Sequence, residues 1–188
     1  MLSFISKLLT GSLLNEFKWF LNKNALSSIN LFVFDVDGVL TEGGLWIQEN
    51  GEILRRYDAR DGMGIKLLKD QGLKIAFLSG GTGKSISNRA EQLDIDYCIQ
   101  GAKDKSVALT EIFNELNCTS DETAFVGDDL YDLAVRKRVK LFFSPVDAPH
   151  YVRNEADAVL QSLGGRGAVR ELAERVLQAR SNGKHEAQ

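Results

Sequence analysis

The chain has 188 residues, of which 44% are hydrophobic and 26% charged, and its formal net charge is −3. This size and composition fit one globular domain with short additions at its ends. The acidic balance argues against a nucleic-acid partner, which would require a basic surface. No apolar run approaches the roughly 20 residues of a membrane span. Cys98 and Cys118 lack the spacing of a zinc site or a disulfide framework, which favours a reducing, cytoplasmic setting.

Residues 1–29 are expected to form an amphipathic helical extension. Apolar residues recur at helical spacing over residues 2–21, which predicts one helix or two shorter helices separated near Gly11. We expect the apolar face to pack against the domain or a neighbouring subunit, with a membrane surface or disorder as the alternatives. The large side chains in the second half of this face are Leu13, Leu14, Phe17 and Phe20. The polar residues 181–188 are predicted to be disordered.

The most informative stretch is residues 31–41, with the sequence LFVFDVDGVLT. Four apolar residues lead directly into Asp35 and Asp37, and Gly38 then permits a sharp turn. Side chains two positions apart on a strand point the same way, so both carboxylates can face one site. Such carboxylates repel by about 4 kcal/mol at 4 Å and an effective dielectric near 20, and a divalent cation would reverse this. The plainer alternative is an Asx turn with a helix cap.

Strand patterns alternate with helix patterns from residue 30 to residue 180, which predicts an α/β fold with a doubly wound, Rossmann-like parallel sheet. Asn50-Gly51 between two β-rich runs indicates an inserted β-hairpin, and no segment is long enough for a cap domain. Asp61 is expected to cap the helix that runs to about Gln71. A loop between Pro145 and Pro149 and a last helix ending near Arg180 complete the pattern.

Polar residues collect where the predicted strands end. Because ligands of parallel sheets bind beyond the carboxyl ends of the strands, these residues are expected to share one site. Acids hold a hard cation, a hydroxyl and glycine amides grip phosphate oxygens, and a lysine neutralises phosphoryl charge. Each residue alone has a plainer interpretation as a cap, a turn residue or a surface charge. In strand order, the residues are Asp35 and Asp37, then Ser79 with Gly80, then Lys105, then Asp128 and Asp129.

These four motifs resemble those of the haloacid dehalogenase (HAD) superfamily of phosphohydrolases, over roughly residues 30–178. Within it, the hairpin in place of a cap and three further runs resemble the family of 3-deoxy-D-manno-octulosonate 8-phosphate (KDO 8-phosphate) phosphatases. Those runs are RDGMGIKLL at 60–68, QGAKDK at 100–105 and GGRGAVREL at 164–172. The resemblance implies a Mg²⁺-dependent phosphoric monoester hydrolase that releases KDO for lipopolysaccharide synthesis. It also implies a homotetramer in which hairpins associate and neighbouring chains close each site.

The resemblance further assigns roles in the reaction. Asp35 would attack phosphorus and form an aspartyl-phosphate, while Asp37 would protonate the leaving oxygen and then deprotonate the hydrolytic water. Ser79, Gly80 and Lys105 would hold the phosphoryl oxygens. The implied Mg²⁺ ligands are the Asp35 carboxylate, the Asp37 backbone carbonyl and Asp128, with Asp129 as an alternative or outer ligand. Asp132 would orient Lys105 or metal-bound water, and Arg60 and Arg166 would contact the substrate carboxylate or phosphate.

Two departures from the family pattern bear on the substrate. Ser79-Gly80-Gly81 stands where many relatives have Thr-Gly-Arg, so a basic residue expected beside the phosphate loop is missing. Tyr131 stands where Asn is common. The rival interpretations are a phosphatase for nine-carbon, sialic-acid-type sugar 9-phosphates and a non-catalytic scaffold that retains the fold. Loss of Asp35 or Asp37 would favour the scaffold, and both residues are present.

Overall fold

A six-stranded parallel sheet forms the centre of the molecule. The computed structural model describes residues 2–185, with side chains for residues 12–181. The strand order is β5-β4-β1-β6-β7-β8, and every neighbouring pair is parallel. The chain therefore has the predicted doubly wound α/β topology. The strands are β1 (Leu31–Phe34), β4 (Lys74–Leu78), β5 (Tyr97–Ile99), β6 (Thr123–Val126), β7 (Leu141–Ser144) and β8 (Ala158–Val159).

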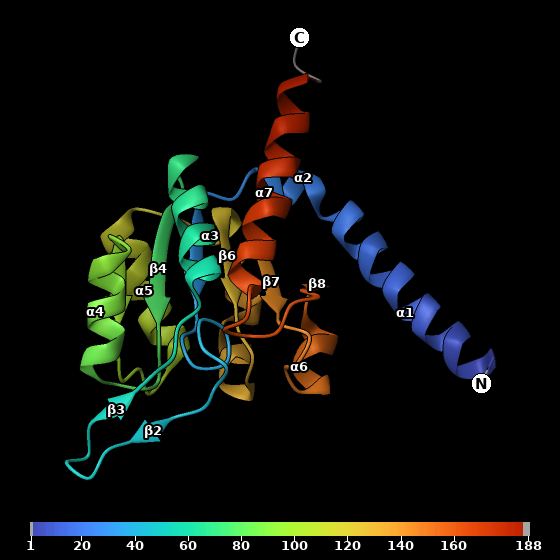
Figure 1. Ribbon diagram of the computed structural model, residues 1–188. Helices are drawn as coiled ribbons and strands as arrows, with labels where there is room; N and C mark the ends of the chain where they lie inside the picture. The colour runs from blue at the N-terminus through green and yellow to red at the C-terminus, as the bar shows by residue number, and fades with distance from the viewer. Residues whose placement is uncertain (1, 186–188) are drawn as a thin grey trace.

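Helices cover both faces of this sheet (Figure 1). Apolar residues of one sheet face form a core with α3 (Ala59–Asp70), α4 (Lys84–Gln92) and α7 (Ala168–His185). The opposite core joins the sheet to α5 (Lys105–Leu116), the 3₁₀ helix η2 (Leu130–Arg138) and α6 (His150–Glu155). A short 3₁₀ turn, η1 (Ser120–Glu122), precedes β6. All four residues of β1 are buried, as expected for a strand between two helical layers.

Two local predictions are corrected by the structure. Asp58, and not Asp61, caps α3, because the Asp58 carboxylate accepts a hydrogen bond from the Arg60 amide. The Asp61 carboxylate instead accepts from the amides of Gly167, Val169 and Arg170 at the start of α7. The predicted loop between Pro145 and Pro149 is present, and α6 begins directly after it. The last helix continues to His185, so residues 181–185 are helical, and residues 186–188 lie outside the described chain.

The amino-terminal segment is one continuous helix, α1 (Leu2–Leu21), followed by α2 (Lys23–Ser27). Trp19 is buried and stacks on Phe143, and the Asn15 side chain exchanges two hydrogen bonds with the Val159 backbone on edge strand β8. The apolar face predicted to pack inward is exposed within this chain, since Leu13, Leu14, Phe17 and Phe20 are 55–72% accessible. The first half of that face lies outside the described side chains. The domain therefore holds α1 through the side that carries Asn15 and Trp19, and packing of the apolar face against a neighbouring subunit stays a prediction.

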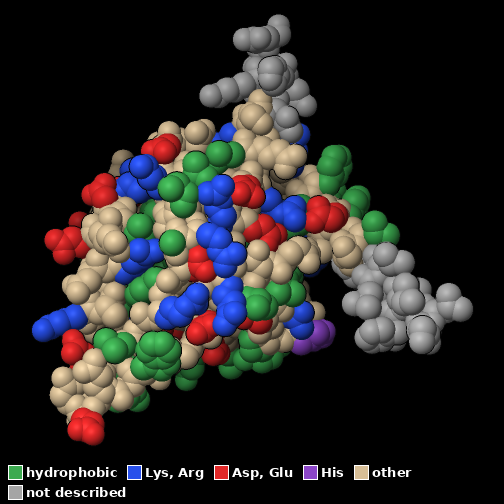
Figure 2. Space-filling model, viewed as in Figure 1, with side chains coloured by type: hydrophobic (Ala, Val, Ile, Leu, Met, Phe, Trp, Pro, Cys, Tyr) green, Lys and Arg blue, Asp and Glu red, His purple; other side chains and the backbone are tan. Residues whose placement is uncertain are grey.

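The predicted hairpin is present and projects from the body of the molecule (Figure 1). Strands β2 (Trp46–Ile47) and β3 (Ile53–Leu54) pair antiparallel, and Gly51 at the turn has a φ of 80° that favours glycine. Hydrophobic side chains are visible over the hairpin (Figure 2), and Trp46 and Ile47 are 63% and 71% exposed. Among the described helices, none combines the length and the hydrophobicity that a membrane span requires.

Candidate active site

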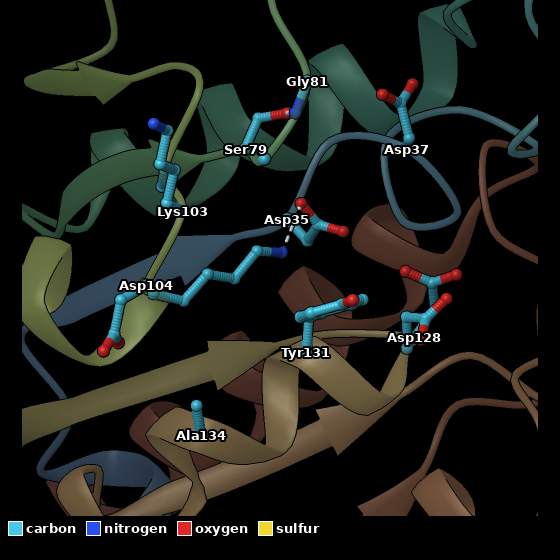
Figure 3. A pocket seen from close by; sticks show the side chains of 13 residues that line it. Asp35, Asp37, Ser79, Gly81, Lys103, Asp104, Asp128, Tyr131 and Ala134 are labelled. Carbon is cyan, nitrogen blue, oxygen red and sulfur yellow. Dashed lines mark hydrogen bonds and ion pairs between the residues drawn. The ribbon is translucent and has the colours of Figure 1, made fainter.

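The strand ends of β1, β4 and β6 open into one pocket of about 540 Å³. Registers Phe34 to Phe77 and Phe34 to Val126 place these ends side by side, as predicted. In Figure 3 the carboxylates of Asp35 and Asp128, which follow β1 and β6, point toward the same space. The lining residues are Asp35, Asp37, Ser79, Gly80, Gly81, Ala102, Lys103, Asp104, Lys105, Asp128, Asp129, Tyr131 and Ala134.

Asp35 lies at the centre of the site and is only 6% exposed. Its Oδ1 lies 2.8 Å from Lys105 Nζ, and this contact is marked in Figure 3. Burial and then the neighbouring Asp132 carboxylate raise the pKa of Asp35 to about 7, while Lys105 opposes this rise. Burial disfavours the charge on Lys105, but Asp35 and Asp132 outweigh it and raise the lysine pKa. Lys105 therefore helps to hold the buried carboxyl of Asp35 in its ionised form.

Asp132 organises the loop that carries Asp128. The Asp132 side chain is fully buried, and its Oδ1 lies 2.5 Å from Lys105 Nζ. Its Oδ2 accepts hydrogen bonds from the amides of Asp128 and Asp129, at 2.9 and 3.0 Å. Both oxygens of Asp132 are thus engaged within the protein. This arrangement agrees with the expectation that Asp132 orients Lys105.

The carboxylate of Asp128 has a buried oxygen, Oδ1, that forms no hydrogen bond. Burial, followed by Asp35 and Asp132, raises the pKa of Asp128 to about 8. Gly38 makes room for this group, because a Cβ at Gly38 would lie 1.9 Å from Asp128 Oδ2, and its φ of 93° also favours glycine. Carboxylate oxygens of Asp35, Asp128 and Asp132 lie within 4.8 Å of one another.

Of these carboxylates, those of Asp35 and Asp128 fit a divalent cation such as Mg²⁺, because both oxygens of Asp132 already accept hydrogen bonds. Three acids face one buried lysine, and the unpaired Asp128 oxygen supplies the hard ligand that Mg²⁺ prefers. A cation there would offset the repulsion that raises both pKa values. Asp129 lines the pocket, but it is exposed and its side chain caps η2 by accepting from the Leu130 amide.

The remaining predicted residues fall into two groups. Ser79 is buried at the end of β4, and its Oγ accepts a hydrogen bond from the Gly81 amide at 3.0 Å. Arg60 and Arg166 do not line the pocket within this chain. The Arg60 guanidinium pairs with Asp58 at 2.8 Å, and that of Arg166 pairs with Glu42 at 2.7 Å. Their contact with substrate remains a prediction.

Two cations of the site were not predicted. Arg55 forms a double contact with Asp37, with Nε 2.8 Å from Oδ1 and Nη2 3.0 Å from Oδ2. Lys103 lines the pocket two residues before Lys105 and has no ion-pair partner among the described side chains. The QGAKDK run that contains Lys103 was a sequence signal for it. Arg55 had no such signal, because its neighbours depend on how the hairpin returns to the sheet.

A parallel sheet that presents Asp35, Asp37, Ser79, Lys105 and Asp128 at its strand ends defines a phosphohydrolase of the HAD superfamily. A putative HAD superfamily (subfamily III A) hydrolase from Legionella pneumophila has the same fold. Its TM-score is 0.85 at 34% identity, with 92% of this chain and 94% of the neighbour covered. No family model matches the chain.

The relatives define the family more narrowly. The KDO 8-phosphate phosphatase KdsC of Haemophilus influenzae is 38% identical over 154 residues, or 82% of this chain and 86% of that protein. The enzyme of the same name from Yersinia pestis is 37% identical over 153 residues, or 81% of this chain and 82% of that protein. The chain belongs to the KDO 8-phosphate phosphatase family. A family structure from Moraxella catarrhalis, in complex with magnesium, phosphate and KDO, is 31% identical with a TM-score of 0.81, covering 88% of this chain and 95% of that one.

Proposed function

We propose that this protein hydrolyses KDO 8-phosphate to KDO and phosphate through an aspartyl-phosphate on Asp35. The observation that carries this proposal is the Asp35 carboxylate, buried at a strand end, 2.8 Å from Lys105 and beside the unpaired oxygen of Asp128. That arrangement combines a nucleophile, a cation for phosphoryl charge and an open ligand for a metal. The similarity to KdsC enzymes supports the choice of substrate.

In the first step, Asp35 attacks phosphorus in line and the bond from phosphorus to the sugar oxygen breaks. Asp37 donates its proton to that oxygen as the sugar leaves. In the second step, Asp37 accepts a proton from water, which attacks the aspartyl-phosphate and restores the Asp35 carboxylate. Lys105, the Ser79 hydroxyl and the backbone beside Gly80 hold the phosphoryl oxygens during both steps.

Mg²⁺ would be held by the Asp35 carboxylate, the Asp37 backbone carbonyl and Asp128, with Asp129 as an outer ligand. When bound, it supplies positive charge that neutralises the phosphoryl group and the clustered carboxylates. The buried, unpaired Oδ1 of Asp128 supports this ligand set. Asp132 is not included, because both its oxygens already accept hydrogen bonds from the protein.

Substrate selection is proposed to involve the cations that remain at the pocket and its rim. Lys105 is engaged by two carboxylates, so Lys103 is the lining lysine left to meet the carboxylate of a sugar acid. Arg60 and Arg166 are proposed to reach the substrate in the assembled enzyme. Both side chains are more than half exposed, which leaves them accessible from solvent.

The active form is proposed to be a cytoplasmic homotetramer. A pocket without a cap domain is poorly screened from water. The exposed apolar side chains of the hairpin, Trp46, Ile47 and Leu54, offer a surface on which copies can associate and cover it. Free Cys98 and Cys118 are compatible with a reducing compartment. Light scattering at micromolar concentration tests the assembly, and a monomer would contradict it.

The experiment for the reaction is phosphate release with Mg²⁺ from a small panel of substrates. The panel contains KDO 8-phosphate, a sialic-acid-type 9-phosphate, hexose phosphates and an aryl phosphate. Preference for KDO 8-phosphate is expected. Preference for the nine-carbon substrate would retain the mechanism and replace the substrate, whereas no turnover of any ester would favour the scaffold.

A further inference from the structure

The guanidinium of Arg55 is enclosed where three segments of the chain meet. Arg55 directly follows β3 of the hairpin, and its side chain is only 1% exposed. Nε and Nη2 contact the two oxygens of Asp37, whereas Nη1 donates to the Thr82 carbonyl at 3.2 Å and to the Ser85 hydroxyl at 3.1 Å. One side chain therefore joins the hairpin to the loop after β1 and to the start of α4.

Gly81 leaves the space that this guanidinium occupies. A Cβ on Gly81 would lie 2.7 Å from Arg55 Nη2 and 3.0 Å from Asp37 Oδ2. Figure 3 shows Gly81 beside Ser79, on the same side of the pocket as Asp37. The sequence lacks a basic residue at position 81, and the structure brings a cation to the same place from the hairpin. The two observations are complementary, because a side chain at Gly81 and the present position of Arg55 exclude each other.

We propose that Arg55 is a positioning residue that holds the acid–base carboxylate of Asp37 and makes its placement depend on the hairpin. This inference rests on the proposed function, in which Asp37 serves the leaving oxygen and then water. A guanidinium that bonds both carboxylate oxygens fixes the plane of the carboxylate as well as its position. The contacts with Thr82 and Ser85 in turn fix the guanidinium. A displacement of the hairpin would therefore also displace the Asp37 carboxylate.

Two substrates with different leaving groups distinguish a role of Arg55 in positioning Asp37 from a role in supporting the fold. A sugar alkoxide needs a proton to leave, whereas p-nitrophenolate leaves without one. General acid–base groups contribute about 10²- to 10⁴-fold to rate. Loss of positioning alone is therefore expected to lower kcat of Arg55→Met on the sugar phosphate by about 10- to 100-fold. KM should stay within about threefold, and the p-nitrophenolate burst that reports the first step should fall much less.

The neighbouring arginine provides a matched control. Arg56 has the same chemistry, but its side chain is 47% exposed and its nearest carboxylate contacts are 3.9 and 4.0 Å long. Arg56→Met is expected to change neither kcat nor the leaving-group dependence by more than about twofold, as for other surface substitutions. Arg55→Lys, which retains the charge but cannot bond both oxygens in one plane, should give an intermediate kcat.

A double-mutant cycle with Asp37→Asn, read by kcat on the sugar phosphate, decides the mechanism of the effect. If Arg55 acts through Asp37, Arg55→Met causes no further loss in the Asp37→Asn background. The inference would be overturned if Arg55→Met lowered the rate by the same factor in the wild type and in Asp37→Asn. It would also be overturned if Arg55→Met lowered the rate by the same factor with both leaving groups. A wild-type protein that hydrolyses no phosphate ester would overturn this inference and the proposed function together. Activity on another sugar phosphate would change only the substrate, and the cycle would then be read with that ester.

Discussion

Asp128→Asn is expected to stabilise the metal-free protein at pH 7 and to abolish its stabilisation by Mg²⁺. Burial and the neighbouring Asp35 and Asp132 raise the pKa of Asp128 from 3.8 to about 8. A carboxyl with a raised pKa binds its proton more tightly in the folded state than in the unfolded state. The free energy of unfolding therefore falls as pH rises through the interval from about 4 to about 8. Asparagine keeps nearly the same volume and cannot acquire the charge.

The magnitude follows from the same pKa values. A tenfold change in a protonation equilibrium corresponds to about 1.4 kcal/mol, and about three powers of ten separate the ordinary pKa of Asp128 from pH 7. The resulting cost of about 4 kcal/mol is an upper bound, because water in the open pocket relieves part of it. We expect the free energy of unfolding of the Asn variant to exceed that of the metal-free wild type by roughly 2–4 kcal/mol at pH 7, and by little at pH 4.

Denaturant unfolding of EDTA-treated protein at both pH values measures this difference. Addition of Mg²⁺ at 100 times the dissociation constant should then stabilise the wild type by about 2.7 kcal/mol and the variant not at all, which removes most of the difference at pH 7. Asp104→Asn is the matched control. Asp104 lines the same pocket but is exposed and caps α5, a role that Asn fulfils equally well. A metal-free Asp128→Asn protein no more stable than the wild type would refute the reasoning.

Three further predictions concern other parts of the molecule. Hydrogen bonding to Arg60 lowers the pKa of Asp58 to about 2. In acid unfolding curves, the wild type should therefore be more stable than Asp58→Asn above pH 4, and this advantage should disappear as pH falls through about 2. Asp58→Ala should lower the free energy of unfolding by about 1 kcal/mol more than Asp58→Asn does, because the α3 cap is lost. Ile47→Asp on the exposed hairpin should shift the light-scattering mass toward monomer, and an unchanged mass would exclude the hairpin as the interface. Lys103→Gln should raise KM about tenfold for KDO 8-phosphate and leave KM for a hexose phosphate unchanged; equal KM effects on both substrates would contradict carboxylate recognition.

The strand-end residues of the site were predictable because they depend on local patterns and on one general property of parallel sheets. An apolar run followed by Asp35, Ser79 or Asp128 marks the end of a strand, and parallel strands end at the same edge. The resulting pocket contains all of these residues, together with Lys105. Their proximity thus followed from the sequence, although their hydrogen-bond partners did not.

The features that were missed depend on contacts between distant segments. The spacing of Asp61 suggests a cap for its own helix, yet its partners are more than 100 residues away at the start of α7. Helical periodicity finds an apolar face on α1, but the polar pairing of Asn15 with β8 decides which face the domain covers. Arg55 likewise becomes part of the site only when the hairpin folds back toward Asp37. None of these pairings has a local sequence signature.

The measurement that tests the central claim most directly is detection of phosphate bound covalently to Asp35. The protein would be mixed with Mg²⁺ and radiolabelled substrate, quenched in acid within one turnover and digested for mass spectrometry. The account predicts label on the peptide that contains Asp35, and no label in a folded Asp35→Asn variant that also shows no turnover. Turnover without a labelled intermediate, or label and activity retained in Asp35→Asn, would contradict it.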